Sequence, residues 1–377
     1  NLMNAMIYAA VEQYSTSHLR KSSIRMLARS ITENKSHHGE HYITRNRSEY
    51  FKMFYSAAGG GVIIALMALN KIHIASLGFG EFTTSFLAGL NYGLGFMLIH
   101  MLHCTVATKQ PAMTAASFAE QVDSNEGSKA VDNKLAKLLI DVCRSQSVAV
   151  FGNVSIAVLL AAGIAWGYAY THGQPLLNEA VTAYQLKSIE IFTQPTLWYA
   201  AIAGVWLFCS GIIAGFFDNR SDYLNLRQRL PFNPFLRKIM RPQPRRRLAA
   251  YIHKHYGSLM GNFIFGMLLG MTGYFGHLFG LPLDIRHVAF SSANLGYAAI
   301  SGHADIFTFM LGLVSVLAIG MVNLVVSFSL ALAVALRSRG TRLGSMRNLL
   351  KSFWSQVKAN PLILLYPVQV NNKENTK

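Results

Sequence analysis

The chain is poor in cysteine and in the short motifs that mark common enzymes. It has 377 residues and only three cysteines, Cys104, Cys143 and Cys209, which show no CxxC pair and no metal-like spacing. A disulfide framework is therefore not expected. Walker A, GxGxxG, GxSxG and HExxH motifs are also absent from the sequence, which argues against an ATPase, a dinucleotide enzyme and a zincin. We expect no cofactor and no bound metal.

Charged residues are scarce as well, and acidic ones most of all. They make up 14% of the chain, whereas a soluble domain carries roughly 25%. The 34 Lys+Arg outnumber the 17 Asp+Glu, so the formal net charge is +17. Such an excess is typical either of nucleic-acid binding or of basic loops beside an anionic membrane leaflet. The positions of the charges distinguish these two explanations.

Long apolar runs are what the sequence does have, since 52% of its residues are hydrophobic. A bilayer core of roughly 30 Å is crossed by about 20 apolar residues in a helix. Six stretches qualify: Ser56–Ser76, Phe82–His103, Val148–Tyr170, Leu197–Phe217, Leu259–Leu281 and Ile306–Leu336. The first is the weakest, because Lys71 and His73 lie near its outer end, where a lysine can snorkel to water.

The basic residues alternate with these spans. Of the 34 Lys+Arg, 31 fall before the first span, after the last, or in the loops that follow spans two and four. Lys71, Lys187 and Arg286 are the remaining three. By the positive-inside rule the basic side is cytoplasmic. The sequence therefore predicts an all-α, polytopic membrane helix bundle of six transmembrane helices with both termini in the cytoplasm.

The expected domain organisation follows from this topology. Residues 1–52 are a cytoplasmic helical segment that ends a larger N-terminal region, 53–340 form the six-span domain with basic loops at 104–147 and 218–258, and 341–377 are a basic tail. Ala112–Val122 and Lys129–Cys143 are expected to be two short helices. The stretch from Asp284 to Ile300 is half polar and too short to span, which is typical of an interfacial or re-entrant segment.

Glycine is frequent within the spans at small-xxx-small spacing. The pairs are Gly89 and Gly93, Gly163 and Gly167, Gly211 and Gly215, and Gly266 and Gly270. This pattern is typical of close helix packing in lipid. In span five, Asn262, Gly266, Gly270, Gly273 and His277 share one helical face. That face is expected to be a packing seam, with the wall of a substrate path as the alternative.

Ionisable residues in or beside spans are candidate functional residues, because burying them in lipid is costly. An inner group contains His100, His103, Lys109, Asp218 and Arg220, and an outer group contains Glu81, His277, Asp284, Arg286, His287, His303 and Asp305. His100 and His103 share a helical face at i, i+3, but no third ligand for a metal is evident. The candidate polar membrane site comprises His100, His103, Lys109, Gln110, Asn262, His277, Asp284, Arg286, His287 and Asn294.

Three longer stretches carry a resemblance to a known family. They are residues 91–100 with 107–115, residues 261–270, and residues 280–296. Together they resemble a bacterial membrane-protein family catalogued as "site-specific recombinase", over about residues 50 to 350. The resemblance implies a bacterial cytoplasmic (inner) membrane protein with a helical region ahead of the membrane part. By its name it also implies DNA recombination, although no catalytic residue carries over onto a matching motif.

Two functions from different classes remain open. The first is a transport or membrane-scaffold role, and the alternative is site-specific recombination of DNA; whether the protein is an enzyme is left open. The expected partners are the lipid bilayer, anionic lipids, a small-molecule substrate, DNA and a second copy of the chain in a homo-oligomer. The basic run Arg245, Arg246 and Arg247 is the expected contact for anionic lipid or nucleic acid.

Overall fold

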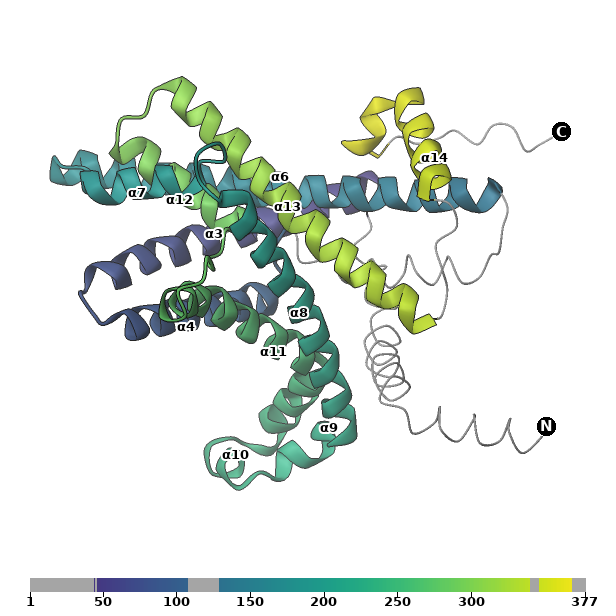
Figure 1. Ribbon diagram of the computed structural model, residues 1–377. Helices are drawn as coiled ribbons and strands as arrows, with labels where there is room; N and C mark the ends of the chain where they lie inside the picture. Colours follow the sequence, from purple (N-terminus) through teal and green to yellow (C-terminus); the bar gives the residue numbers. More distant parts are fainter. Residues whose placement is uncertain (1–43, 45, 108–128, 340–345, 368–377) are drawn as a thin grey trace, which may run out of the picture.

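The computed structural model describes residues 44, 46–107, 129–339 and 346–367, and every regular element in these ranges is a helix. The helices are α3 (Arg47–Ser76), α4 (Glu81–Met101), α6 (Lys129–His172), α7 (Glu179–Ile189), α8 (Thr196–Tyr223), α9 (Leu226–Arg229), η2 (Leu230–Phe232), α10 (Pro234–Ile239), α11 (Pro242–Leu278), α12 (Val288–Ser301), α13 (Ile306–Arg339), α14 (Met346–Ala359) and η3 (Pro361–Leu364) (Figure 1). The predicted helix Ala112–Val122 lies outside the described residues.

Six of these helices, α3, α4, α6, α8, α11 and α13, are long and apolar enough to cross a membrane. The all-α class and the number of spans are thus confirmed. In Figure 1 the turn between α3 and α4, helix α7 and the turn between α12 and α13 lie toward the left, whereas α9, α10 and α14 lie toward the bottom or right. The short connections and the basic ones therefore gather at different ends of the bundle. We call these the outer end and the inner end, after the sides of the membrane that the sequence predicts for them.

Helix α6 is one continuous helix where the sequence predicts two separate elements. The expected short helix Lys129–Cys143 is continuous with the third span, so α6 has 44 residues and is ~66 Å long at 1.5 Å per residue. Its first half is not a loop because it has an apolar face with partners. Leu135 and Val142 are buried against Leu336 of α13 and Leu349 of α14. This cluster extends the bundle at the inner end.

The glycine face of α11 packs directly on α4. A Cβ placed on Gly266 would lie 2.1 Å from the backbone N of Gly93, and one on Gly270 would lie 2.3 Å from the N of Gly89. The two backbones are therefore in contact, and only glycine allows this approach. We call Gly89, Gly93, Gly266 and Gly270 the glycine seam. For these residues the packing prediction is confirmed.

The same prediction is wrong for the glycine pair of α6. A Cβ on Gly163 or Gly167 meets nothing within 4 Å. The neighbouring Trp166 is 63% exposed, so no described helix covers this face of α6. Spacing alone does not distinguish a glycine that faces a helix from one that faces outward.

Helix α12 contains most of the half-polar stretch 284–300 and is enclosed by other helices. It packs on α3, α6, α7 and α13. Fully buried Asn323 of α13 holds its start: the side-chain oxygen accepts from the N–H of Val288 at 3.0 Å, and the amide nitrogen donates to the carbonyls of Ala200 at 2.7 Å and Arg286 at 3.0 Å. Protein groups thus satisfy backbone hydrogen-bonding groups at the buried start of this short helix, as burial requires.

A second buried amide has the same role near the inner end. Asn153 of α6 donates to the carbonyls of Ala57 and Thr105 and accepts from the N–H of Ala107 at 2.6 Å. It therefore ties α3 and α6 to the chain that follows α4. Sequence reasoning did not single out Asn153 or Asn323, because a lone asparagine in an apolar run gives no sign of its partners.

Candidate functional site

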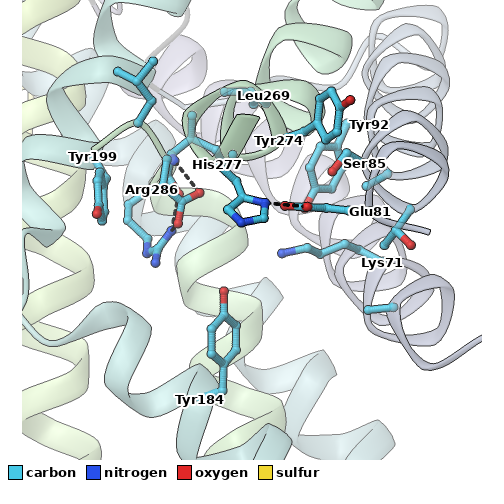
Figure 2. A pocket seen from close by; sticks show the side chains of 18 residues that line it. Lys71, Glu81, Ser85, Tyr92, Tyr184, Tyr199, Leu269, Tyr274, His277 and Arg286 are labelled. Carbon is cyan, nitrogen blue, oxygen red and sulfur yellow. Dashed lines mark hydrogen bonds and ion pairs between the residues drawn. The ribbon is translucent and has the colours of Figure 1, made fainter. Parts of the chain in front are cut away.

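A polar cavity of about 460 Å³ opens at the outer end, between α3, α4, α7, α11 and the segment that precedes α12 (Figure 2). This volume is within the usual range of about 300–1,000 Å³ for small-molecule sites. The charged and aromatic lining residues are Lys71, Glu81, Tyr92, Tyr184, Tyr199, Tyr274, His277, Asp284 and Arg286. Hydrophobic lining comes from Leu269, Leu283 and Ile285.

A histidine–carboxylate pair and an arginine–carboxylate ion pair lie in this wall. His277 Nδ1 of α11 lies 2.6 Å from Glu81 Oε2 of α4, and both side chains are largely exposed. Arg286 Nη1 lies 2.6 Å from Asp284 Oδ2. The other Asp284 oxygen, Oδ1, accepts from the N–H of Ile285 at 2.8 Å. Each carboxylate therefore already has a partner from the protein.

Arg286 is held in place by backbone groups from two directions. Its Nε donates to the carbonyl of Ser188 at the end of α7, at 2.6 Å, and its own N–H donates to the carbonyl of Tyr199 at 3.2 Å. The guanidinium also lies over the Tyr199 ring, 5.3 Å from the centroid. These contacts orient the guanidinium and leave its Nη2 without a hydrogen-bond partner among the described residues. The Arg286 side chain is thus held in place and still has a hydrogen-bond donor available at Nη2.

Lys71 of α3 also lines the cavity. Figure 2 shows its ammonium directed into the central space that the Tyr184 hydroxyl, the His277 ring and the Arg286 guanidinium also face. Within the described part of the chain, Lys71 makes no hydrogen bond or ion pair. At its position near the end of a span, Lys71 therefore lines the cavity in addition to being able to snorkel to water.

Below the cavity the bundle is closed by packed rings. Tyr92 stacks on Phe290 with 4.1 Å between ring centroids, and Phe96 and Phe265 lie beneath. His287 is among these rings, 5.8 Å from Phe265, and burial lowers its pKa to about 3. It is neutral at physiological pH, and its Nδ1 accepts from the N–H of Ala289 at the start of α12. His287 therefore belongs to the core below the cavity and not to its polar wall.

Comparison with known proteins adds the family. Residues 1–367 match the model of a family described as "Site-specific recombinase". This chain belongs to the site-specific recombinase family. The family named from the three sequence stretches is thus confirmed. No curated protein matches the chain, and no solved structure does.

In this member of the family, three of the predicted site residues meet in one cavity: His277, Asp284 and Arg286. The inner candidates do not join them. His100 lies at the opposite end of α4, where its Nε2 is 3.1 Å from Nδ1 of His255 on α11. The predicted shared face of His100 and His103 is wrong. Helix α4 ends at Met101, and His103 adopts a left-handed φ of 56° in the exposed turn that follows.

The other predicted residues are dispersed. Asn262 is buried on α11 below the glycine seam, and Asn294 lies on α12, where its Oδ1 has no partner among the described residues. Arg246 and Arg247 are exposed near the start of α11, at the inner end, and Arg245 precedes them. Lys109 and Gln110 lie outside the described residues.

One contact at the inner end resembles a catalytic triad without the geometry to act as one. Ser221 Oγ lies 3.0 Å from His253 Nδ1, and His253 Nε2 lies 3.5 Å from Asp222 Oδ1. However, Ser221 is 1% exposed and also donates to the His253 carbonyl at 3.0 Å. A nucleophile must reach its substrate, so this serine instead links α8 to α11.

Sequence reasoning missed Lys71 as a site residue and all four tyrosines. A lysine five residues before the end of a span was a usable signal, because a charge there needs either water or a polar partner. Tyr92, Tyr184, Tyr199 and Tyr274 had no such signal. They come from four different segments, and only the packing of those segments brings them together.

Proposed function

We propose that the protein binds a small polar solute in the outer cavity and moves it across the bacterial inner membrane, with both chain ends in the cytoplasm. The observation that carries this proposal is the cavity itself. It combines enough volume for a small molecule, hydrogen-bond donors without partners among the described residues, and a position at the outer end of a six-span bundle. A small number of polar groups in a concave site is typical of small-molecule binding.

The packing beneath the cavity supports a state that is open only outward. The glycine seam and the ring cluster of Tyr92, Phe96 and Phe265 close the path toward the inner end. Transport therefore requires α4 and α11 to separate below the cavity, as in alternating access. A seam of glycines suits such a movement, since few interlocked side chains must be unpacked.

A cavity-filling variant tests solute binding. A Cβ on Gly273 would lie 3.5 Å from Asp284 Oδ1, an ordinary contact, so Gly273→Leu can fill the cavity without disturbing the seam. The full chain in detergent is screened by thermal shift against small polar solutes, and any stabilising solute is then used in uptake assays with proteoliposomes. We expect at least one solute to stabilise the parent and not the variant. If no solute binds the parent, the proposal is overturned and a membrane-scaffold role takes its place.

The family description names DNA recombination, and its chemistry can be tested directly. Tyrosine and serine recombinases attach covalently to DNA. In the basic inner part of α11, His255 contacts His100 and His253 contacts Ser221, so these histidines are engaged between helices. We expect DNA binding to be electrostatic, to fall steeply with salt, and to weaken equally on all sequences when Arg245, Arg246 and Arg247 become alanine. A covalent adduct with a nicked duplex, lost on changing one Tyr or Ser, would instead show that the chain carries out recombinase chemistry.

A further inference from the structure

The unused hydrogen-bonding groups of the outer cavity are donors. Among the described residues, no protein acceptor takes the ammonium of Lys71, the Nη2 of Arg286, or the hydroxyls of Tyr92 and Tyr184. Two of these groups carry positive charge. The four come from α3, α4, α7 and the segment before α12, and Figure 2 shows Lys71, Tyr184 and Arg286 directed toward the same space.

Both carboxylates of the cavity already have hydrogen-bond partners within the protein. Glu81 pairs with His277 at 2.6 Å, and Asp284 pairs with Arg286 at 2.6 Å while it also accepts from Ile285. With both carboxylates engaged, Lys71 contributes a positive charge that has no ion pair. An anionic ligand would give Lys71 the ion pair that it lacks, whereas a cationic ligand would have to displace His277 or Arg286 from its carboxylate partner.

The rest of the lining is apolar and fits a hydrocarbon part of a ligand as well as its polar group. Leu269, Leu283 and Ile285 line the same cavity as the tyrosine rings. Bare phosphate or sulfate would leave this surface unused in a volume of about 460 Å³. A carboxylate with a small apolar or aromatic body would use both parts, because its oxygens can accept from Lys71 and Arg286 while its body covers the side chains around them.

From this arrangement we propose that the solute of the outer cavity is a small organic carboxylate, bound through Lys71 and the free edge of Arg286. The assignment rests on the proposed solute-binding function and names its substrate class. Tyr184, at 56% exposure on α7, supplies a further donor from the opposite wall. Lys71 is the main determinant, since its ammonium makes no hydrogen bond or ion pair with the described residues.

Three probes that share a ring and differ in charge test the class. Benzoate, benzamide and benzylamine are compared with inorganic phosphate on the full chain in detergent, by thermal shift and by calorimetry at constant ionic strength. We expect benzoate to stabilise the protein and the amide, amine and phosphate to have little effect. Lys71→Gln should weaken benzoate binding at least tenfold, while Lys71→Arg should retain most of it.

Lys187→Gln is the matched control, because Lys187 is an exposed lysine of α7 that does not line the cavity. It should bind benzoate as the parent does. Unliganded melting temperatures of all variants show whether the fold is kept. If benzamide, benzylamine or phosphate binds best, or if Lys71→Gln binds benzoate unchanged, the carboxylate assignment is overturned although solute binding stands. If no probe and no other polar solute binds, the proposed function fails as well.

Discussion

The inner and outer halves of the α4–α11 pair are built from the same two antiparallel helices and differ in what lies between them. In the middle of the pair, Gly93 meets Gly266 and Gly89 meets Gly270, with backbone in contact with backbone. About two turns further out, Glu81 and His277 meet at 2.6 Å across the mouth of a cavity. One pair of helices thus provides a closed seam and an open polar site.

The difference has a simple physical cause. Where both helices present glycine, the axes approach closely and leave no space. Where they present Tyr274, Glu81 and His277, these side chains line a cavity, and α3, α7 and the Arg286 segment line it from the other sides. The lesson is that polar side chains near the end of a span can form a cavity when the neighbouring turns pack tightly.

The largest expected effect concerns which end of the comparison faces outward, because a topology reporter gives an all-or-none signal. Fusions after Gln174 and Ser301, near the cavity end, should report an extracytoplasmic location. A fusion after Gln243, in the basic connection at the other end, should report a cytoplasmic one. An extracytoplasmic reading at Gln243 would contradict the topology, since that connection has the most positive charge.

The seam should break on adding a large side chain. Gly270→Leu should destabilise the bundle by at least about 3 kcal/mol, because its side chain would overlap the backbone of Gly89. The measurement is thermal unfolding in detergent. Gly163→Leu is the matched control: a glycine of another span with nothing within 4 Å of its Cβ, where the change should be tolerated. Equal melting temperatures for Gly270→Leu and the parent would refute the seam.

The cavity wall should depend on Asn323, which holds the Arg286 carbonyl and the start of α12. Asn323→Leu would leave the buried Val288 N–H and Arg286 carbonyl without this partner and should cost about 2–3 kcal/mol. It should also weaken ligand binding in the cavity, because Arg286 lines the cavity. Gln174→Leu, at an exposed position in the turn after α6, is the comparison and should change stability by less than about 0.5 kcal/mol. Equal effects of the two changes would contradict this role of Asn323.

The smallest effect is a pH dependence of the rings below the cavity. The folded protein keeps His287 neutral with a pKa of about 3, whereas the unfolded chain binds a proton there below about pH 6.5. This contribution to stability is present above pH 6.5 and is lost as pH falls, by about 1.4 kcal/mol per pH unit.

His287→Asn keeps a capping side chain without a proton to bind, so the variant should show a shallower loss of stability between pH 6.5 and 5. Parallel melting curves for parent and variant over this interval would contradict a buried neutral His287. The other titratable groups act alike in both proteins, so only the difference in slope is read.

Particular elements show where sequence reasoning succeeded and where it stopped. The 4-4-3-4 spacing places the predicted face of span five on one side whatever the neighbour. Gly266 and Gly270 form the predicted packing seam, whereas Gly270, Gly273 and His277 line the cavity. The face of Gly163 and Gly167 has the same local pattern but no neighbour among the described residues. His103 was assigned to a helix that ends at Met101, and Lys129–Cys143 was separated from a helix that it continues. Each error concerned contacts that lie outside the local window.

The sequence by itself determined the family, the all-α class and the six spans, because the length of an apolar run is a local property and bilayer thickness translates it directly into a helix. It also brought His277, Asp284 and Arg286 under suspicion through the cost of burying charge. Only the tertiary structure decided that these residues share a cavity with Lys71 and four tyrosines, and that His100 does not. The reason is physical: a cavity is the space that packed helices fail to fill, and packing depends on how all the spans fit together.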